Sequence, residues 1–200
     1  MKIVTIDLET SGIPPKGANY ETDFAVFPHI LGMAWKINDG KTVEYIINNP
    51  GVVITQEITK INGITQAMCD ASHYTIESTL NQFYVDCQGN DYVVGHNIYF
   101  DTSIIKANCL RAKMPIFEAL TVILDKEKRI DTMRAGTKLC GKWPKLTELY
   151  MKLFQEDFDA HSAGQDVEAC YKCFVKLQEL NLIVLKEPVK SEPEPVLAVE

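Results

Sequence analysis

The sequence feature that most constrains the fold is an Asp-Gly turn between two strand-like segments near the start of the chain. Residues 30–37 and 43–47 are rich in apolar, β-branched and aromatic side chains, and the polar tetrapeptide Asn-Asp-Gly-Lys at 38–41 separates them. An Asp-Gly pair between two such runs is a strong signal for a β-hairpin. Residues 2–8 form an earlier apolar run that is typical of a buried strand. The chain is therefore expected to open with a strand and an antiparallel hairpin.

Helical and strand-like patterns alternate through the rest of the chain, after a long loop predicted over residues 12–28. Helices are predicted over 55–61, 75–87, 101–112, 145–154 and 162–182, another helix begins at 131–132, and short strands are predicted over 92–95 and 129–130. Leading strands followed by this alternation indicate an α/β fold with a mixed five-stranded sheet flanked by helices. We expect one folded domain over residues 1–183 and a disordered tail, rich in Pro and Glu, over 184–200.

The composition is that of an ordinary globular protein. Of the 200 residues, 46% are hydrophobic and 24% are charged. No apolar run approaches the roughly 18 residues that a transmembrane helix needs, and the start lacks the features of a secretory signal. We therefore expect a cytoplasmic protein with no membrane partner. The six cysteines follow no disulfide spacing, and we interpret Cys170 and Cys173 as buried thiols in a helix.

The net charge of −7 argues against capture of nucleic acid by the whole protein surface. It does not exclude an enzyme that acts on nucleic acid, because a bound divalent cation reverses the local sign of the potential. From Lys126 to Lys145 there are seven Lys and Arg residues against two acids. Two interpretations of this basic segment stay open: a solvated face, or a patch that contacts a phosphate backbone.

Two carboxylates at the end of the first predicted strand, Asp7 and Glu9, suggest a metal site. Residues two apart on a strand point to the same face, while Leu8 between them points into the core. Two such carboxylates repel one another unless a cation lies between them. The polar turn 10–12 follows directly and places the acids at the carboxyl end of a strand, where ligands bind in α/β sheets.

Further polar residues follow the predicted strand 92–95. His96 and Asn97 come directly after it, and Asp101 begins the next helix. Asp101 would serve as a simple helix cap. A cap does not need the neighbouring imidazole and amide, however, so we interpret these residues as part of a site at the sheet edge. Asp131, by contrast, we interpret as a structural cap of the helix that follows it.

The last candidates are His161 and Asp166, around the start of the final predicted helix. On a continuous helix these two residues would diverge by about 140°, so they share a site only if His161 precedes the helix and Asp166 lies in its first turns. An acid on a buried helix stripe is costly unless it is paired or binds a metal, which makes Asp166 a functional candidate. The stripe that it begins continues through Cys170, Cys173, Leu177 and Leu180.

Taken in order and spacing, these motifs resemble those of the DEDDh exonucleases. The motifs are Asp-x-Glu at 7–9, Asn-x-x-Phe-Asp at 97–101 and His-x-x-x-x-Asp at 161–166. The family includes the proofreading subunit of bacterial replicative polymerase, RNase T and oligoribonuclease. The resemblance covers roughly residues 1–182, and it implies an RNase H-like fold.

The resemblance also implies two Mg²⁺ or Mn²⁺ ions, which prefer carboxylate oxygens. By that resemblance the first ion would be bound by Asp7, Glu9 and Asp166. Asp7 would bridge to the second ion, which Asp101 would hold directly or through water. His161 would act as the base that deprotonates the attacking water. The substrate-binding residues that it implies are Thr10, Asn62, His96, Asn97 and Phe100; at Asn62 the family often has a histidine.

The implied function is a metal-dependent 3′-to-5′ exonuclease that releases nucleoside 5′-monophosphates from single-stranded nucleic acid. We expect DNA rather than RNA as its substrate, although no motif reports contacts to the 2′-hydroxyl. The expected partners are single-stranded 3′ ends and a polymerase or another replication or repair protein. Two alternatives stay open. One is a non-catalytic nucleic-acid-binding or accessory subunit that retains the exonuclease fold, and the other is a two-metal phosphoesterase that acts on small nucleotides.

Overall fold

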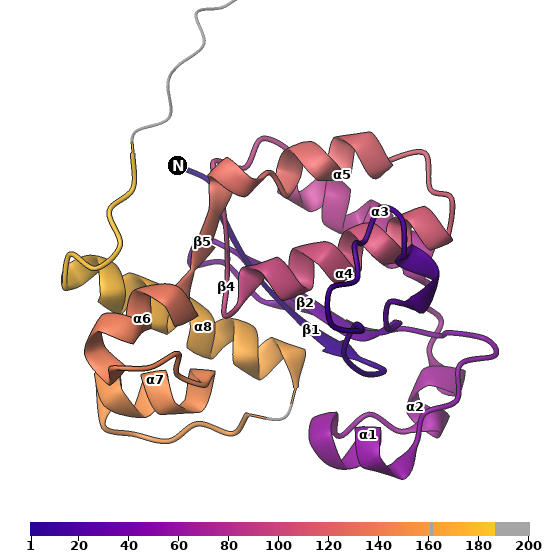
Figure 1. Cartoon of the computed structure of the whole chain (residues 1–200), viewed down its shortest axis with the longest axis horizontal. Coiled ribbons are helices and arrows are strands. Elements are labelled where there is room, and N and C mark those ends of the chain that lie inside the picture. The colour runs from indigo at the N-terminus through magenta and orange to yellow at the C-terminus, as the bar shows by residue number, and fades with distance from the viewer. Residues whose placement is uncertain (161, 187–200) are drawn as a thin grey trace, which may run out of the picture.

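A computed structural model describes residues 1–160 and 162–186 of the chain. Figure 1 shows a central sheet with helices on both of its faces. The expected α/β architecture with a mixed five-stranded sheet is confirmed. His161 and residues 187–200, which include most of the predicted tail, lie outside the described residues.

The sheet has the strand order β3-β2-β1-β4-β5. Its strands are β1 (Ile3–Thr10), β2 (Ile30–Ile37), β3 (Val43–Ile46), β4 (Tyr92–Gly95) and β5 (Arg129–Asp131). β2 and β3 form the predicted hairpin, and β2 also pairs antiparallel with β1. On the other side of β1, β4 runs parallel to it and β5 runs parallel to β4. The carboxyl ends of β1, β4 and β5 therefore lie at one edge of the sheet.

β1 and β4 separate towards that edge. β1 pairs with β2 over Val4–Thr10, but it pairs with β4 only over Ile3–Thr5. The chain continues from β1 to β2 on one side and from β4 to β5 on the other. Such a divergence point, at the carboxyl ends of the strands, is where open α/β sheets bind ligands.

Alternate side chains of β1 face the main core. Val4, Ile6 and Leu8 are buried in that core, whose other members come largely from β2 and from three helices. This division follows from the two-residue period of a strand. The three helices are α3 (Ile76–Cys87), α4 (Ile98–Arg111) and α5 (Phe117–Ile123).

The opposite face of the sheet is covered by α8 (Ala163–Glu179), which packs against β1, β2 and β4 (Figure 1). Small apolar clusters join α8 to the sheet through Val167, Cys170 and Phe174. Cys170 and Cys173 are buried free thiols, as predicted. α6 (Thr132–Cys140) and α7 (Leu146–Phe154) pack against α8.

Several helix boundaries differ from the prediction. α1 (Gln56–Asn62) lies near its expected position, but the short helices α2 (Gln66–Ala71) and α5 were not predicted. α4 begins at Ile98, so the prediction that Asp101 begins this helix was wrong. α8 ends at Glu179, and Leu180 is 46% exposed, so its assignment to the buried stripe was also wrong.

The predicted loop 12–28 contains a single short 3₁₀ helix (Phe24–Val26) and is tied to the end of α4. Arg111 donates hydrogen bonds from Nη2 to the carbonyl oxygens of Phe24, at 2.8 Å, and of Phe27. Asn108 donates from Nδ2 to the carbonyl oxygen of Pro28 at 3.0 Å. These bonds fix the last part of the loop against the helix. Across the described segments, none of the helices combines the length and apolar character needed to cross a membrane.

Candidate active site

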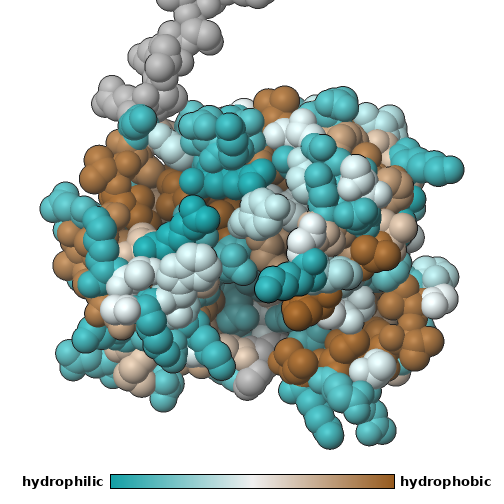
Figure 2. Space-filling view, in the orientation of Figure 1, coloured by the Kyte–Doolittle hydropathy of each residue, from teal (hydrophilic) through white to brown (hydrophobic). Residues whose placement is uncertain are grey.

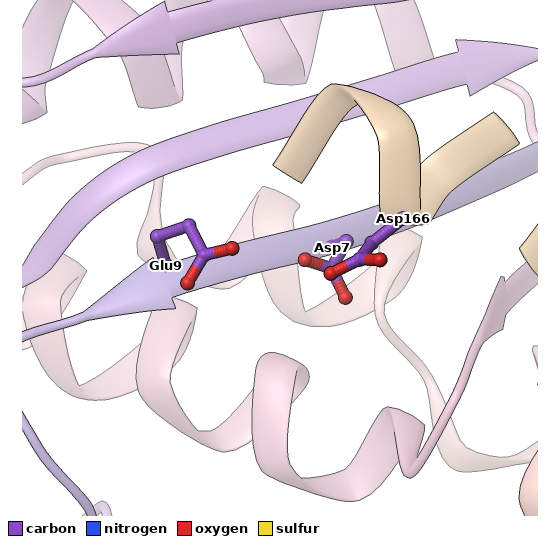
Figure 3. Close-up of side chains that lie close together, drawn as sticks. All are labelled: Asp7, Glu9 and Asp166. Carbon is purple, nitrogen blue, oxygen red and sulfur yellow. The ribbon is translucent and has the colours of Figure 1, made fainter. Parts of the chain in front are cut away.

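Three carboxylates from distant parts of the chain meet at the carboxyl end of β1. Asp7 and Glu9 project from β1, and Asp166 projects towards them from the first turn of α8 (Figure 3). One oxygen atom from each of the three carboxylates lies within 4.8 Å of the others. Three hard oxygen donors at this separation fit a divalent cation. The predicted meeting of these three residues is therefore present in the structure.

The start of α8 is built so that Asp166 lies in its first turn. Ser162 is the N-cap, and its hydroxyl oxygen accepts a hydrogen bond from the backbone N–H of Gln165 at 3.3 Å. The backbone N–H of Asp166 donates to the carbonyl oxygen of Ser162 at 3.0 Å. A serine cap satisfies a backbone donor that would otherwise have no partner within the helix. The cap thus fixes the point at which α8 begins and, with it, the position of Asp166.

A fourth acid, Glu44 on β3, was not predicted to belong to this region. Its Oε1 accepts a hydrogen bond from the backbone N–H of Gly164 at 3.0 Å. A Cβ atom at Gly164 would lie 2.5 Å from Oε2 of Glu44, so glycine permits the close approach. No sequence pattern signals this contact, because Glu44 is an exposed strand residue and its partner is 120 residues away.

Burial and mutual repulsion raise the pKa values of the acids. Burial raises the pKa of Asp7 well above its usual range, and neighbouring charges raise it further, in the order Asp101, Asp166, Glu9 and Glu44. Burial, followed by the charges of Asp166 and Glu44, raises the pKa of Glu9 to about 7. Carboxyl groups that hold protons near neutral pH release them when a cation binds. The electrostatics therefore favour a bound metal.

Asp101 lies close to this group but is not one of the three acids that meet within 4.8 Å. Asp101 is 3% exposed and lies in the first turn of α4. Burial raises the pKa of Asp101 well above its usual range, hydrogen bonding from its own backbone lowers it, and the charges of Asp131 and Glu9 raise it. The backbone N–H of Leu8 also stabilises the ionised form. Asp101 therefore lies beside β1 in the gap that β4 leaves.

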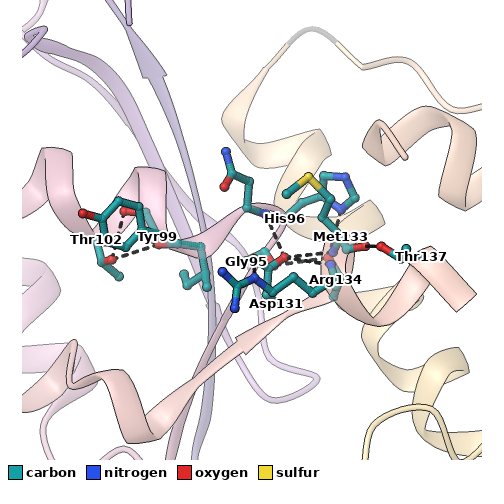
Figure 4. Close-up of polar contacts among 11 residues, drawn as sticks. Gly95, His96, Tyr99, Thr102, Asp131, Met133, Arg134 and Thr137 are labelled. Carbon is teal, nitrogen blue, oxygen red and sulfur yellow. Dashed lines mark hydrogen bonds and ion pairs between the residues drawn. The ribbon is translucent and has the colours of Figure 1, made fainter. Parts of the chain in front are cut away.

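Asp131 caps α6, as predicted, and it also fixes the start of α4. Its Oδ1 accepts hydrogen bonds from the backbone N–H groups of Met133 at 2.9 Å and Arg134 at 3.3 Å (Figure 4). The same oxygen accepts from the backbone N–H of Asn97 at 3.1 Å. Asn97 is the N-cap of α4 and has a left-handed backbone with φ of 70°. One carboxylate thus joins the two segments that follow β4 and β5.

His96 is held by contacts on both sides of its ring. Its Nδ1 lies 3.0 Å from Oγ1 of Thr132, and its Nε2 lies 2.9 Å from the carbonyl oxygen of Pro144. Burial lowers the pKa of His96, while the carbonyl of Pro144 and the charge of Asp131 raise it. A neutral ring that donates from Nε2 and accepts at Nδ1 fits these contacts. Direct contact with a substrate would have to replace one of them.

The other predicted substrate-binding residues differ in exposure. Asn62 is 4% exposed; it donates from Nδ2 to the carbonyl oxygen of Thr10 at 3.3 Å and accepts at Oδ1 from the N–H of Ile64 at 3.0 Å. The hydroxyl of Thr10 donates to the carbonyl oxygen of Gly12 at 2.7 Å. Asn97 is exposed, whereas Phe100 is half-buried against the main core. The side chain of Asn97 is therefore the most accessible of this set.

The predicted base, His161, lies outside the described residues. A pocket of about 750 Å³ borders the start of α8. It is lined by polar residues of β3 and α8 and by the rings of Tyr150 and Phe158. On the face shown in Figure 2, the surface is hollowed between α4 and α8, and hydrophilic residues gather there. Hydrophobic side chains gather instead over α1 and α2, where Val53, Ile61 and Met68 are exposed.

Comparisons with solved structures agree with this fold. Exonuclease I from Methylocaldum szegediense superimposes with a TM-score of 0.67 at 19% identity, covering 90% of this chain and 40% of that one. Exonuclease I from E. coli, in complex with a dT13 oligonucleotide, gives a TM-score of 0.68 at 17% identity over 89% of this chain and 41% of that one. The nuclease domain of 3′hExo, a DEDDh family member bound to rAMP, gives a TM-score of 0.61 at 15% identity, covering 90% of this chain and 92% of that one. These likenesses place the chain in the RNase H-like exonuclease fold.

Comparisons of sequence identify the family. A DNA polymerase III of PolC type from Clostridium perfringens is 32% identical over 109 residues, which are 54% of this chain and 7% of that polymerase. The chain thus spans a small part of this relative and less than half of the exonuclease I chains. The family model described as Exonuclease, RNase_T, matches residues 4–174. The chain therefore belongs to this exonuclease family.

Proposed function

We propose that the chain is a metal-dependent 3′-to-5′ exonuclease that releases nucleoside 5′-monophosphates from single-stranded nucleic acid. The observation that carries this proposal is the meeting of Asp7, Glu9 and Asp166 within 4.8 Å at the carboxyl end of β1. Two-metal phosphodiester cleavage requires ligands that hold the ions beside the substrate, and the carboxyl ends of the strands are where open α/β sheets bind ligands. Membership of the exonuclease family supports the same reaction.

Asp7, Glu9 and Asp166 are the residues that we assign to the first Mg²⁺ or Mn²⁺ ion. Asp7 would be shared with a second ion held by Asp101, whose charge already raises the pKa of Asp7. When bound, such ions stabilise negative charge on the attacking and leaving oxygens of the phosphodiester. The burial of Asp7 and Asp101 strengthens these interactions, because the local dielectric is low.

We assign His161 the role of general base. The assignment rests on its position five residues before Asp166, just before the Ser162 cap of α8. An imidazole with a pKa near 7 can accept a proton from water at neutral pH. The positions of His161 and Asp166 in the sequence allow both to serve one phosphodiester.

DNA is the substrate that we favour, and a polymerase or another replication or repair protein is the partner class. The match to a DNA polymerase III of PolC type supports both choices. The likeness to the nuclease domain of 3′hExo, bound to rAMP, is the reason to test RNA beside DNA. Co-elution of the chain with a replicative polymerase on a sizing column would support the partner class, and separate elution would contradict it.

The test uses 5′-labelled single-stranded DNA and RNA oligomers of one sequence with Mg²⁺, Mn²⁺ or EDTA. Wild-type protein should shorten the labelled oligomer from its 3′ end in single-nucleotide steps and release 5′-monophosphates. EDTA should stop the reaction, and Asp166→Asn should slow it by a factor on the order of 10³ because it removes a metal-binding charge. The relative rates on the two oligomers rank DNA against RNA.

The matched control is Asp39→Asn, which removes an equal charge from a residue that is 91% exposed and remote from the acids. This variant should retain wild-type rates. Folded wild-type protein that cleaves neither oligomer but binds both would overturn the proposal and support a non-catalytic binding subunit instead. Cleavage of small nucleotide esters without cleavage of either oligomer would indicate a phosphoesterase that acts on small nucleotides.

A further inference from the structure

A second, smaller pocket lies beside the acids, on the side of β5. It has a volume of about 300 Å³ and lies between the first turn of α4, the start of β5 and the first turn of α6. Two of its lining residues, Ile98 and Tyr99, lie with Asp101 in the first turn of α4. The pocket therefore adjoins the end of the acidic site that Asp101 occupies. Its lining residues are Ile98, Tyr99, Lys126, Arg129, Asp131 and Arg134.

Three cations line this pocket in a chain whose net charge is −7. The Arg134 side chain is 71% exposed, and its Nε lies 3.9 Å from Oδ2 of Asp131. The Lys126 side chain is 80% exposed, and its Nζ lies 3.9 Å from Oε1 of Glu127. Exposed ion pairs at such distances contribute little to stability. Both cations can therefore turn to an external anion at little cost.

The third cation has a fixed position. The guanidinium of Arg129 donates from Nε and Nη2 to the carbonyl oxygen of Leu124, at 3.0 and 2.8 Å. These bonds hold the group at the pocket wall, while its charge still acts on the pocket interior. A fixed cation beside two exposed ones can contact several phosphates of one strand, and such contacts position nucleic acids on proteins.

An aromatic ring completes the pocket. Tyr99 is 61% exposed in the first turn of α4, two residues before Asp101. Its backbone carbonyl accepts a hydrogen bond from Oγ1 of Thr102 at 3.3 Å, within the helix (Figure 4). Exposed aromatic rings among cations are the combination that single-stranded nucleic acids use, since bases stack on the ring and phosphates pair with the cations.

We propose that this pocket binds the strand on the 5′ side of the scissile phosphodiester, with a base stacked on Tyr99 and phosphates paired with Arg134 and Lys126. The inference rests on the proposed exonuclease function, because it places the 3′-terminal nucleotide at Asp7, Glu9 and Asp166. It assigns to this chain a preference for oligomers over mononucleotide esters. Arg134 and Lys126 lie outside the motifs that mark the family in the sequence, and Tyr99 occupies a variable position of the motif at 97–101.

The experiment compares a 10-nucleotide single-stranded DNA with the p-nitrophenyl ester of thymidine 5′-monophosphate. Tyr99→Ala should lower the ratio of kcat/KM for the oligomer to that for the ester about tenfold, which is the expected loss of one stacked base. Tyr99→Phe keeps the ring and should restore the ratio. Arg134→Ala should make the slope of log(kcat/KM) against log[KCl] less negative by about 0.7. Lys41→Ala, an exposed cation in the β2–β3 turn at the other end of the sheet, is the matched control and should change neither quantity.

Binding of the same oligomer is measured separately by fluorescence anisotropy, with Ca²⁺ in place of Mg²⁺. Weaker binding by Tyr99→Ala and Arg134→Ala, against unchanged binding by Lys41→Ala, supports the pocket even if the protein cleaves nothing. In that case the exonuclease proposal fails and the pocket proposal stands. The pocket proposal would be overturned, and the exonuclease proposal left intact, if Tyr99→Ala and Arg134→Ala both kept the wild-type oligomer-to-ester ratio and the wild-type affinity for the oligomer. An equal loss on ester and oligomer would also overturn it, because it would show damage to the acidic site.

Discussion

At the scale of single residues, the acids at the end of β1 oppose the folding of the metal-free protein. The pKa of Glu9 is raised from 4.5 to about 7 in the folded protein. Between these pH values the folded state binds more protons than the unfolded chain, so its free energy of unfolding falls as the pH rises. The contribution of one such group is at most about 1.4 kcal/mol per pH unit. Asp7 and Asp101, whose pKa values are also raised, act in the same direction.

This predicts that Glu9→Gln is more stable than the wild type in EDTA above pH 7, and that the difference shrinks as the pH falls towards 4.5. Urea unfolding at several pH values measures it. Mg²⁺ should reverse the order at pH 8, because it stabilises the wild type through a carboxylate that the variant lacks. A difference that stays constant with pH would contradict the assignment of the raised pKa to Glu9.

The candidate site could be predicted from the sequence where its geometry is local. The two-residue spacing of Asp7 and Glu9 fixes a common face of a strand, and the position of Asp166 on an apolar stripe fixes the face of the helix on which it lies. Glu44 could not be predicted, because its role depends on a contact between β3 and α8 across 120 residues. Nothing in a strand pattern shows which later helix will approach an exposed acid.

At the scale of elements, α8 is joined to the sheet by a buried lysine. Lys36 on β2 is 6% exposed, and its Nζ donates to the two carboxylate oxygens of Glu168 at 3.0 and 2.9 Å. Glu168 also accepts a hydrogen bond from Thr42, and its side chain is 41% exposed. The two partners therefore differ in burial. Loss of Glu168 leaves a buried ammonium group, whereas loss of Lys36 leaves a carboxylate that is partly exposed to water.

We predict that Glu168→Leu destabilises the protein by about 3 kcal/mol, because it leaves a buried ammonium without its main partner. Lys36→Met should cost only about 1 kcal/mol, because the remaining carboxylate can be hydrated. The double variant should cost less than the sum of the two. Urea unfolding at pH 7 measures all three. Equal costs, or a larger cost for Lys36→Met, would show that the pair is not buried as described.

The elements that could be predicted are those with strong local signals. The hairpin of β2 and β3 follows from its Asp-Gly turn, and Thr75 marks the start of α3 through a capping box. The start of α4 could not be placed, because its N-cap, Asn97, makes no side-chain capping bond and relies on Asp131 instead. α5 has no side-chain cap either and only seven residues, too few to show a helical period.

At the scale of the whole molecule, the proposed function requires a protein with a net charge of −7 to attract a negative substrate at one edge of its sheet. The pairing of β1 with β2 on one side and β4 on the other gathers the acids there, and β5 brings the cationic pocket beside them. Sequence patterns predict five strands but not their order, which depends on contacts between distant segments. This order of the strands places the cationic pocket beside the acids.

The basic segment 126–145 can now be divided. Lys126, Arg129 and Arg134 line the pocket, whereas Lys142 already pairs with Glu148 at 2.6 Å. The two phosphate contacts proposed above, with Arg134 and Lys126, predict a slope of log(kcat/KM) against log[KCl] of about −1.4 for a single-stranded oligomer, at about 0.7 per contact. The rate on the oligomer should be measured at fixed Mg²⁺, with the p-nitrophenyl ester as a control whose slope is near zero. A slope of about −5 would require roughly seven contacts. The phosphate backbone would then follow the whole basic segment. A value of kcat/KM for the ester that hardly changes with salt would show that the steeper dependence arises from binding of the strand rather than from the metal site.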